Sequence, residues 1–223
     1  MLSQKTYDFL FENRMRNSKA WFNEHKGDYQ TYVLEPLVQL AAGLGPAVSS
    51  VDPQIVTEPR VDRTISRIYR DTRFSRDKML YREEMWLSFK RDKHAFPCYP
   101  EFFFVIEPKG FLYGCGYYSP TAEAMDSLRE LITAGDPAFK KALNWYKKQS
   151  NFVLDGDRYK RTRHPHQPEP LRDWLDRKSI SLLRRSSDFN LLFSDRLADA
   201  IGADIRALAP VYNLFIEAER RKQ

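Results

Sequence analysis

The sequence from Glu101 to Tyr118 reads EFFFVIEPKGFLYGCGYY and contains the clearest strand signal in the chain. Two runs rich in aromatic and aliphatic residues, Glu101–Glu107 and Phe111–Tyr118, flank the sequence Pro108-Lys109-Gly110. Proline at the second position of a turn and glycine at the fourth are typical of a type I turn, so this spacing predicts an antiparallel hairpin. Aromatic side chains occur on both faces of each run, as expected of strands in the middle of a sheet that helices cover.

Helical patterns occupy the residues before and after this hairpin. In the first fifty residues, Ser3 and Ser18 are in position to cap two helices, and an apolar stripe then continues with a break expected at Pro36. The sequence Gly43-Leu44-Gly45-Pro46 is expected to end this helical region. After the hairpin, cap and proline signals predict helices that start at or near Ser119-Pro120, Asp136-Pro137, Leu171, Ser194 and Pro210.

Three more segments are candidate strands: Val61–Tyr69, Trp86–Phe89 and Lys178–Leu183. Gly114 and Gly116 lie inside the second run of the hairpin, where glycine is interpreted as allowing a ring or a neighbouring backbone to approach closely. Taken together, the patterns predict a single α+β domain over residues 1–223, with a central, mainly antiparallel sheet covered by helices.

The composition is that of a globular protein and argues against several classes. Hydrophobic residues make up 42% of the chain. No apolar run reaches the roughly 18 residues that a membrane span needs. The N-terminal residues also lack the apolar core of a secretory signal, so a cytoplasmic protein with no membrane segment is expected. Cys98 and Cys115 fit no metal or redox spacing and are expected to be buried free thiols.

The segment from Arg60 to Arg82, RVDRTISRIYRDTRFSRDKMLYR, holds most of the excess positive charge. It contains seven arginines and one lysine against three aspartates, so its local charge is +5, whereas the whole chain carries +6. Guanidinium groups at this density either pair with carboxylates or bind an anion. The leading interpretation is a binding site for a phosphate or carboxylate, with these candidate ligand-binding residues: Arg67, Arg70, Arg73, Lys78, Asp71, Asp77 and Tyr81.

These residues are expected to have different roles. Arg67 and Arg73 would face a cleft and bind the anion, and Lys78 would add a point charge. Arg70 is expected to pair with its neighbour Asp71 and so to have a structural role. The candidate ligand is a small anionic metabolite. The sequence assigns no reaction, no catalytic residue and no oligomeric state, and it leaves open whether the protein is an enzyme.

Two other interpretations use the same segment. In the first, the arginines and aspartates form an internal network that only stabilises the fold. In the second, charge and base stacking act together in a nucleic-acid surface, or the same surface binds a protein. A nucleic-acid surface is expected to be a long stripe that includes a second basic segment. Its aromatic and basic residues would then be Tyr69, Phe74, Tyr81, Trp86, Lys160, Arg161 and Arg163.

The sequence has no Walker loop, no dinucleotide-binding glycine motif and no nucleophile elbow, and it predicts no particular cofactor. His164 and His166 lie among prolines without further ligands at zinc spacing, so a solvated loop is favoured over a metal site. Glu83 and Glu84 are adjacent and would face opposite sides of a strand, so a solvated edge is expected rather than an acid/base pair.

Residues 67–78, RIYRDTRFSRDK, resemble the signature R-I-x-R-D-x-R-F-S-x-D-K of a bacterial and fungal family named domain of unknown function 2461. The resemblance extends over nearly the whole chain, through Asn17–Tyr29, Tyr117–Pro120, Leu128-Arg129 and Lys160-Arg161. The chain departs from the family pattern at Met79-Leu80, where the family has Thr-Pro, and at Thr162–His166, where it has Pro-Lys-Gly. The resemblance implies the fold of the family and a site on residues 67–78, but no activity.

Overall fold

The structure, a computed structural model, describes residues 1–222 and contains within them one five-stranded antiparallel sheet. The strands lie in the order β1-β2-β3-β5-β4, and their bounds are Met85–Phe89, Glu101–Glu107, Gly110–Gly116, Ser181–Ser186 and Val153–Asp155. Two residues join β2 to β3, a connection that only antiparallel neighbours allow, so the predicted hairpin is confirmed. The α+β class with a mainly antiparallel sheet is confirmed as well.

Strand β3 is the middle strand, and all seven of its residues are buried. A Cβ atom at Gly114 would overlap the carbonyl oxygen of Leu182, and one at Gly116 would overlap Ser181. Both contacts are with β5, the next strand in the sheet. The prediction that these glycines allow close approach of a neighbouring backbone is therefore confirmed.

Contacts between residues divide the chain into two compact units. Unit 1 comprises Met1–Phe89, Phe103–Leu112 and Arg185–Ala203; unit 2 comprises Lys90–Phe102, Tyr113–Arg184 and the described residues from Asp204 onward. Strands β2, β3 and β5 contribute residues to both units. The expectation of a single domain stays a prediction.

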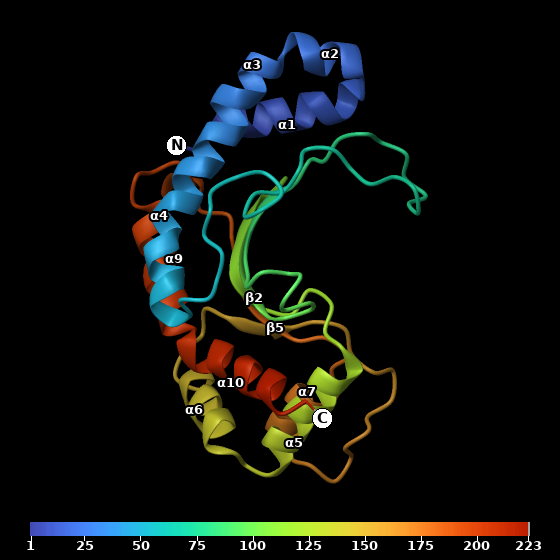
Figure 1. Cartoon of the computed structure of the whole chain (residues 1–223), viewed down its shortest axis with the longest axis vertical. Coiled ribbons are helices and arrows are strands. Elements are labelled where there is room, and N and C mark those ends of the chain that lie inside the picture. The colour runs from blue at the N-terminus through green and yellow to red at the C-terminus, as the bar shows by residue number, and fades with distance from the viewer. Residues whose placement is uncertain (223) are drawn as a thin grey trace. The chain divides into compact units, whose positions relative to one another are not determined.

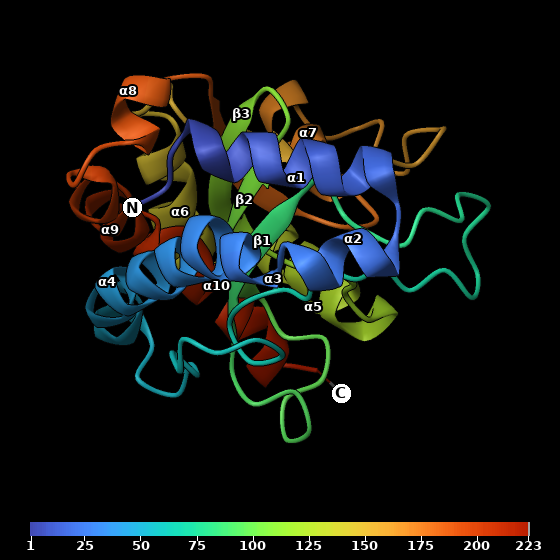
Figure 2. The same ribbon diagram turned by 90° about the horizontal axis from the view of Figure 1, so that it is seen from above.

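The helices of unit 1 begin with α1, which packs against α2 and a π-helical turn (Figure 2). Ser3 and Ser18 are the N-cap residues of α1 and α2, as predicted, and the Ser18 hydroxyl accepts a hydrogen bond from the Trp21 N–H at 3.3 Å. The elements are α1 Gln4–Arg16, α2 Lys19–Glu24, α3 Lys26–Tyr29, the π-helical turn Gln30–Leu34, α4 Glu35–Val51, α8 Phe189–Leu192 and the first part of α9 Leu197–Ala207.

Helix α4 differs from its prediction at one end. The break expected at Pro36 corresponds to the π-helical turn, which ends at Leu34, and to the start of α4 at Glu35. The helix does not end at Gly43-Leu44-Gly45-Pro46, however, but continues through Pro46 to Val51. Leu44, Ala47 and Val48 are all buried, so packing of this face outweighs the hydrogen bond that proline removes.

In unit 2, α10 packs against α5 and α6, and α5 packs against α7 (Figure 1). These helices span Ala122–Thr133 (α5), Pro137–Tyr146 (α6), Glu169–Leu175 (α7) and Ala209–Arg220 (α10). Asp136 caps α6 by accepting a hydrogen bond from the Ala138 N–H at 2.8 Å, and Pro210 lies in the first turn of α10, both as predicted. Helix α5 begins after Thr121 rather than at Ser119-Pro120, because the Thr121 hydroxyl caps it.

The predicted strand Val61–Tyr69 is wrong. This segment runs antiparallel to residues 80–88, but the ladder between them is interrupted. Backbone hydrogen bonds of 2.8–2.9 Å join Thr64 to Ser88, Ser66 to Trp86, Ile68 to Arg82 and Arg70 to Leu80. The pairing shifts by two residues between the second and third bonds, so Glu83 and Glu84 bulge out of the ladder and prevent a continuous strand. Both glutamates are exposed, as predicted.

The two cysteines differ in exposure. Cys115 on β3 is buried, as predicted, and burial raises the pKa of its thiol well above the usual range. Cys98 is exposed, so the expectation of a buried thiol is wrong there. Its backbone is left-handed, with φ of 61°, in the loop before β2, and tight turns of this kind lie on the surface.

Candidate functional site

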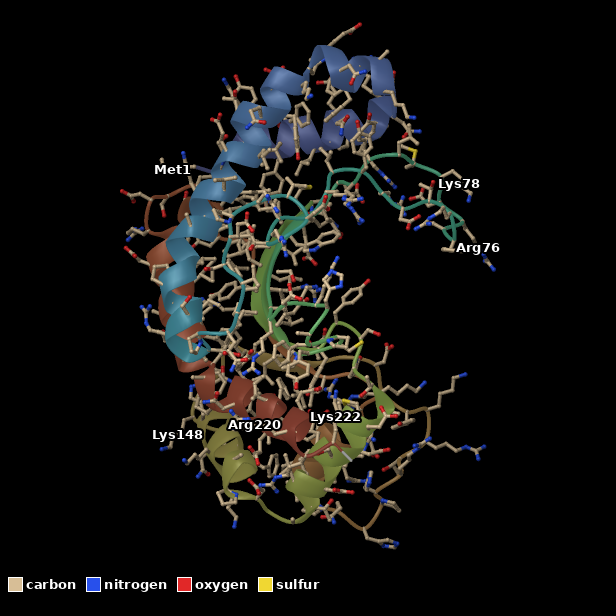
Figure 3. All side chains as sticks on the ribbon, viewed as in Figure 1. Met1, Arg76, Lys78, Lys148, Arg220 and Lys222 are labelled. Atoms are coloured by element: carbon tan, nitrogen blue, oxygen red, sulfur yellow. The ribbon has the colours of Figure 1, made fainter. Side chains whose placement is uncertain are left out.

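The basic segment forms a loop of unit 1 that leaves the interrupted ladder at Arg70 and returns to it at Leu80. The loop projects beyond the end of α1, and Arg76 and Lys78 lie at its outer end (Figure 3). We call residues 67–78 the arginine loop. Its base is fixed by the Arg70–Leu80 backbone pair and by the side chain of Asn17, which accepts a hydrogen bond from the Leu80 N–H at 2.6 Å.

Asp77 is the carboxylate at the centre of the arginine loop. It accepts hydrogen bonds from the Met79 N–H at 2.9 Å, from Arg14 of α1 at 2.6 Å and from Arg70. The backbone N–H of Met79 and the two guanidinium groups hold the pKa of Asp77 far below its usual range. The partner of Arg70 is therefore Asp77, and the predicted Arg70–Asp71 pair is wrong.

Arg73 and Arg67 are also paired with carboxylates. Arg73 binds Asp71 with two parallel hydrogen bonds, Nε to Oδ1 at 3.0 Å and Nη2 to Oδ2 at 2.7 Å. These bonds lower the pKa of Asp71 to about 2. Arg67 pairs with Asp62. Arg67, Arg70 and Arg73 are therefore all paired with carboxylates. A role of these arginines in ligand binding stays a prediction.

Two cations at the outer end of the loop have no such partner. Within residues 1–222, neither Arg76 nor Lys78 forms an ion pair with a carboxylate, and both side chains are exposed. The ammonium group of Lys78 donates only to the carbonyl oxygen of Thr72, at 2.8 Å. Phe74 lies between them and Arg73 in the sequence and is 94% exposed, with the Arg73 guanidinium 5.8 Å from its ring centroid.

Tyr81 lies in the core, although the sequence placed it among the ligand-binding residues. Its side chain has no exposed surface, and its ring centroid is 5.2 Å from that of Phe22 and 5.0 Å from that of Tyr69. Burial and the neighbouring Tyr69 raise its pKa well above the usual range. Tyr81 therefore supports the base of the arginine loop from inside and offers no surface to a ligand.

Sequence reasoning missed Arg76 as a candidate binding residue, and it named Phe74 only in the nucleic-acid interpretation; the structure exposes both in the arginine loop. Both lie within the quoted signature, but their exposure has no local sequence signal. His164 lies with its Nδ1 atom 3.1 Å from the carboxylate of Asp176, and His166 is exposed. Among the described residues, no three His, Cys, Asp or Glu side chains are grouped as a metal site would require.

The sequence model of a protein family described as "Conserved hypothetical protein (DUF2461)" matches residues 5–214, nearly the whole chain. The chain belongs to the DUF2461 family. This confirms the resemblance seen in residues 67–78, and the family description names no activity. Searches of curated proteins and of solved structures found no match. No helix in residues 1–222 has both the length and the apolar character to cross a membrane.

Proposed function

We propose that this DUF2461 protein binds an anionic group, a phosphate or a carboxylate, at the outer end of the arginine loop. The observation that carries the proposal is the pair of exposed cations, Arg76 and Lys78, that lack a carboxylate partner within residues 1–222. An anion that binds there would add charge-assisted hydrogen bonds without breaking an existing ion pair.

The paired residues of the loop keep these two cations available. Asp77 lies between Arg76 and Lys78 in the sequence and would be the nearest group to neutralise them. Its carboxylate is already engaged by Arg14 and Arg70, which hold it on the side of the loop that faces α1. The structural network and the anion site are therefore compatible, because the network engages Asp77 and leaves the cations of Arg76 and Lys78 without a carboxylate partner among the described residues.

A catalytic step has less support than binding. Asp71 and Asp77 are the two carboxylates of the arginine loop that acid/base work would need, and ion pairs and hydrogen bonds lower the pKa of both. A carboxylate with a depressed pKa is a weak base near neutral pH. We therefore propose a binding protein for a small anionic metabolite and assign no reaction. Its proposed location is the cytoplasm, where free thiols such as Cys98 persist.

A second candidate function is binding of single-stranded nucleic acid. The observation that favours it is Phe74, because an aromatic ring that is 94% exposed in a loop with several cations offers a stacking surface for a base. The other aromatic residues of that hypothesis contribute less: Tyr81 is buried, and Trp86 is covered by Arg82, whose guanidinium is 4.4 Å from its ring centroid.

A titration followed by amide NMR signals of residues 71–79 tests the proposal, with inorganic phosphate, acetate and a short single-stranded oligonucleotide as ligands. The variant Arg76→Gln with Lys78→Gln removes two charges from the loop. The control, Lys147→Gln with Lys148→Gln, removes the same charge from exposed positions after α6 in unit 2 (Figure 3).

We expect the loop variant to bind phosphate or acetate at least about tenfold more weakly, because hydrogen bonds to charged groups contribute about 1.5–3 kcal/mol each. The control is expected to bind like the original protein. Equal losses in both variants would show a general charge effect and contradict the proposal. A response to the oligonucleotide alone, abolished by Phe74→Ala, would favour the second candidate.

A further inference from the structure

A second group of cations lies in unit 2, around the ring of Tyr159. The guanidinium carbon of Arg163 is 3.7 Å from the ring centroid, that of Arg129 is 5.5 Å away, and the ammonium nitrogen of Lys178 is 5.7 Å away. The three cations come from separate segments: helix α5, the loop after β4 and the chain after α7. We call these four residues the Tyr159 cluster.

The fold itself holds the cluster together. The backbone N–H of Tyr159 donates to the carbonyl oxygen of Asp176 at 2.9 Å. The Arg129 side chain is only 12% exposed and donates to the carbonyl oxygens of Leu175 at 3.1 Å and Arg177 at 2.7 Å. Carbonyl oxygens of residues 175–177 therefore fix Tyr159 and Arg129 in position beside each other without a bound ligand.

The carboxylates nearby leave two of the three cations unpaired. Asp176 accepts a hydrogen bond from the backbone N–H of Arg163 at 2.9 Å and lies 3.1 Å from the ring of His164, but it forms no ion pair with the Arg163 guanidinium. Among the described residues, neither the guanidinium of Arg163 nor the ammonium of Lys178 has a carboxylate partner. The aromatic ring attracts both cations but cannot neutralise them.

We infer that Arg163, Lys178 and the hydroxyl group of Tyr159 bind a phosphate group. Two unpaired cations match the charge of a phosphate ester, about −1.5 to −2 at neutral pH, better than the single charge of a carboxylate. Arg129, which pairs with Asp126 at 2.6 Å, donates to the Tyr159 hydroxyl oxygen at 3.3 Å. The hydroxyl proton is thereby left to be donated to a phosphate oxygen.

This site goes beyond the proposed function, because it uses none of the residues of the arginine loop. A phosphorylated metabolite and a nucleic-acid backbone both carry the group that it would bind. The flanking residues Lys160 and Arg161 distinguish the two ligands. They are exposed cations of the same segment, and within residues 1–222 neither forms a cation–π contact with the Tyr159 ring. A backbone that runs along the segment would use them, whereas a single phosphate would not.

The test is a phosphate titration at constant ionic strength, followed by amide NMR signals of residues 159–164 and 176–179. The full chain carries Arg76→Gln and Lys78→Gln, so that failure of the loop site and failure of this site are distinguishable. In this background, Arg163→Gln is compared with Arg161→Gln, and Lys178→Gln with Lys160→Gln, since each pair removes the same charge.

We expect Arg163→Gln and Lys178→Gln each to weaken phosphate binding at least about tenfold, and the two flanking variants to leave it unchanged. Tyr159→Phe retains the ring and is expected to weaken binding several-fold through loss of the hydroxyl. An absence of phosphate-induced shifts in the starting protein would overturn the inference, as would equal losses in the matched variants.

A short single-stranded oligonucleotide forms the second arm of the experiment. If inorganic phosphate binds as described and the oligonucleotide binds no more tightly, the site is a discrete phosphate site for a small ligand. If only the oligonucleotide binds, and does so through Lys160 and Arg161 as strongly as through Arg163 and Lys178, the inference is wrong and the segment is a polyanion surface.

Discussion

The arginine loop and the Tyr159 cluster both gather cations, but they differ in what surrounds the charges. In the loop, carboxylates engage Arg67, Arg70 and Arg73, and only the tip is left with unpaired cations. In the cluster, an aromatic ring takes the place of the carboxylates for Arg163 and Lys178. The density of arginines in a sequence is therefore a poor guide to available positive charge. The position of the carboxylates decides which cations can bind a ligand.

The largest expected effect is on stability and concerns Arg177, a buried arginine next to the Tyr159 cluster. Arg177 is 3% exposed, donates to the carbonyl oxygens of Asp173, Gly156 and Leu154, and pairs with the Asp173 carboxylate at 2.9 Å. We expect Arg177→Ala to lower the free energy of unfolding by about 3–5 kcal/mol, because it strands buried acceptors and a partly buried carboxylate. Urea denaturation measures this loss.

Arg158 provides the matched control, since it pairs with the same carboxylate but is 59% exposed. Arg158→Ala is expected to cost at most about 1 kcal/mol, as for other exposed ion pairs. Similar losses of stability in the two variants would show that burial does not decide how much an arginine contributes to stability. That result would contradict the distinction between structural and available arginines.

A smaller effect is expected inside the arginine loop. Arg70 is 22% exposed and shares Asp77 with Arg14, whereas Arg73 is 77% exposed and pairs with Asp71 alone. We expect Arg70→Ala to reduce stability by about 1 kcal/mol and Arg73→Ala to have no measurable effect. Urea melts of the two variants measure the difference. A loss for Arg73→Ala equal to or larger than that for Arg70→Ala would contradict the assignment of Arg70 as the structural arginine of the loop.

The smallest effect is a dependence of stability on pH below 5. The pKa of Asp77 is well below its usual range and that of Asp71 is about 2. Because these folded-state values lie below the unfolded-state value of about 4, the two groups stabilise the fold fully above that pH. Their contribution is lost as the pH falls from about 4 towards the folded-state values. In urea melts between pH 2 and 5, Asp77→Asn should therefore show a shallower decline of stability than the original protein; parallel declines would exclude this contribution.

Sequence patterns predicted the elements whose signals are local. The hairpin of β2 and β3 follows from two aromatic runs and a proline-glycine turn between them, and Asp136-Pro137 marks the start of α6. The strand predicted at Val61–Tyr69 failed because the two bulged residues lie in the partner segment, some fifteen to twenty positions further along the chain. The sequence around Pro46 was interpreted as a helix end because proline and glycine usually stop a helix. The burial that keeps α4 helical through Pro46 depends on tertiary contacts, which the local sequence does not show.

The location of the candidate site could be proposed from the sequence, but its ion pairs could not. Residues 67–78 were identified from charge density and from the family signature, and both are local properties of the sequence. The sequence does not show whether Arg70 pairs with Asp71 or with Asp77. The position of Asp77 is fixed in part by Arg14, which lies on α1 sixty-three residues earlier in the chain. The sequence drew attention to Arg129 and Arg163 separately, but not to their meeting at the Tyr159 ring, because separate segments supply the cations and only the tertiary fold brings them together.

The most direct test of the central claim is to observe the arginine side chains themselves. In a protein labelled with nitrogen-15, the Nε–Hε signals of individual arginines are followed during a titration with inorganic phosphate. The account predicts that the signals of Arg76 and Arg163 shift, whereas those of Arg67, Arg70 and Arg73 stay in place because carboxylates already bind them. Shifts of Arg67, Arg70 and Arg73 at lower phosphate concentrations than those of Arg76 and Arg163 would contradict it.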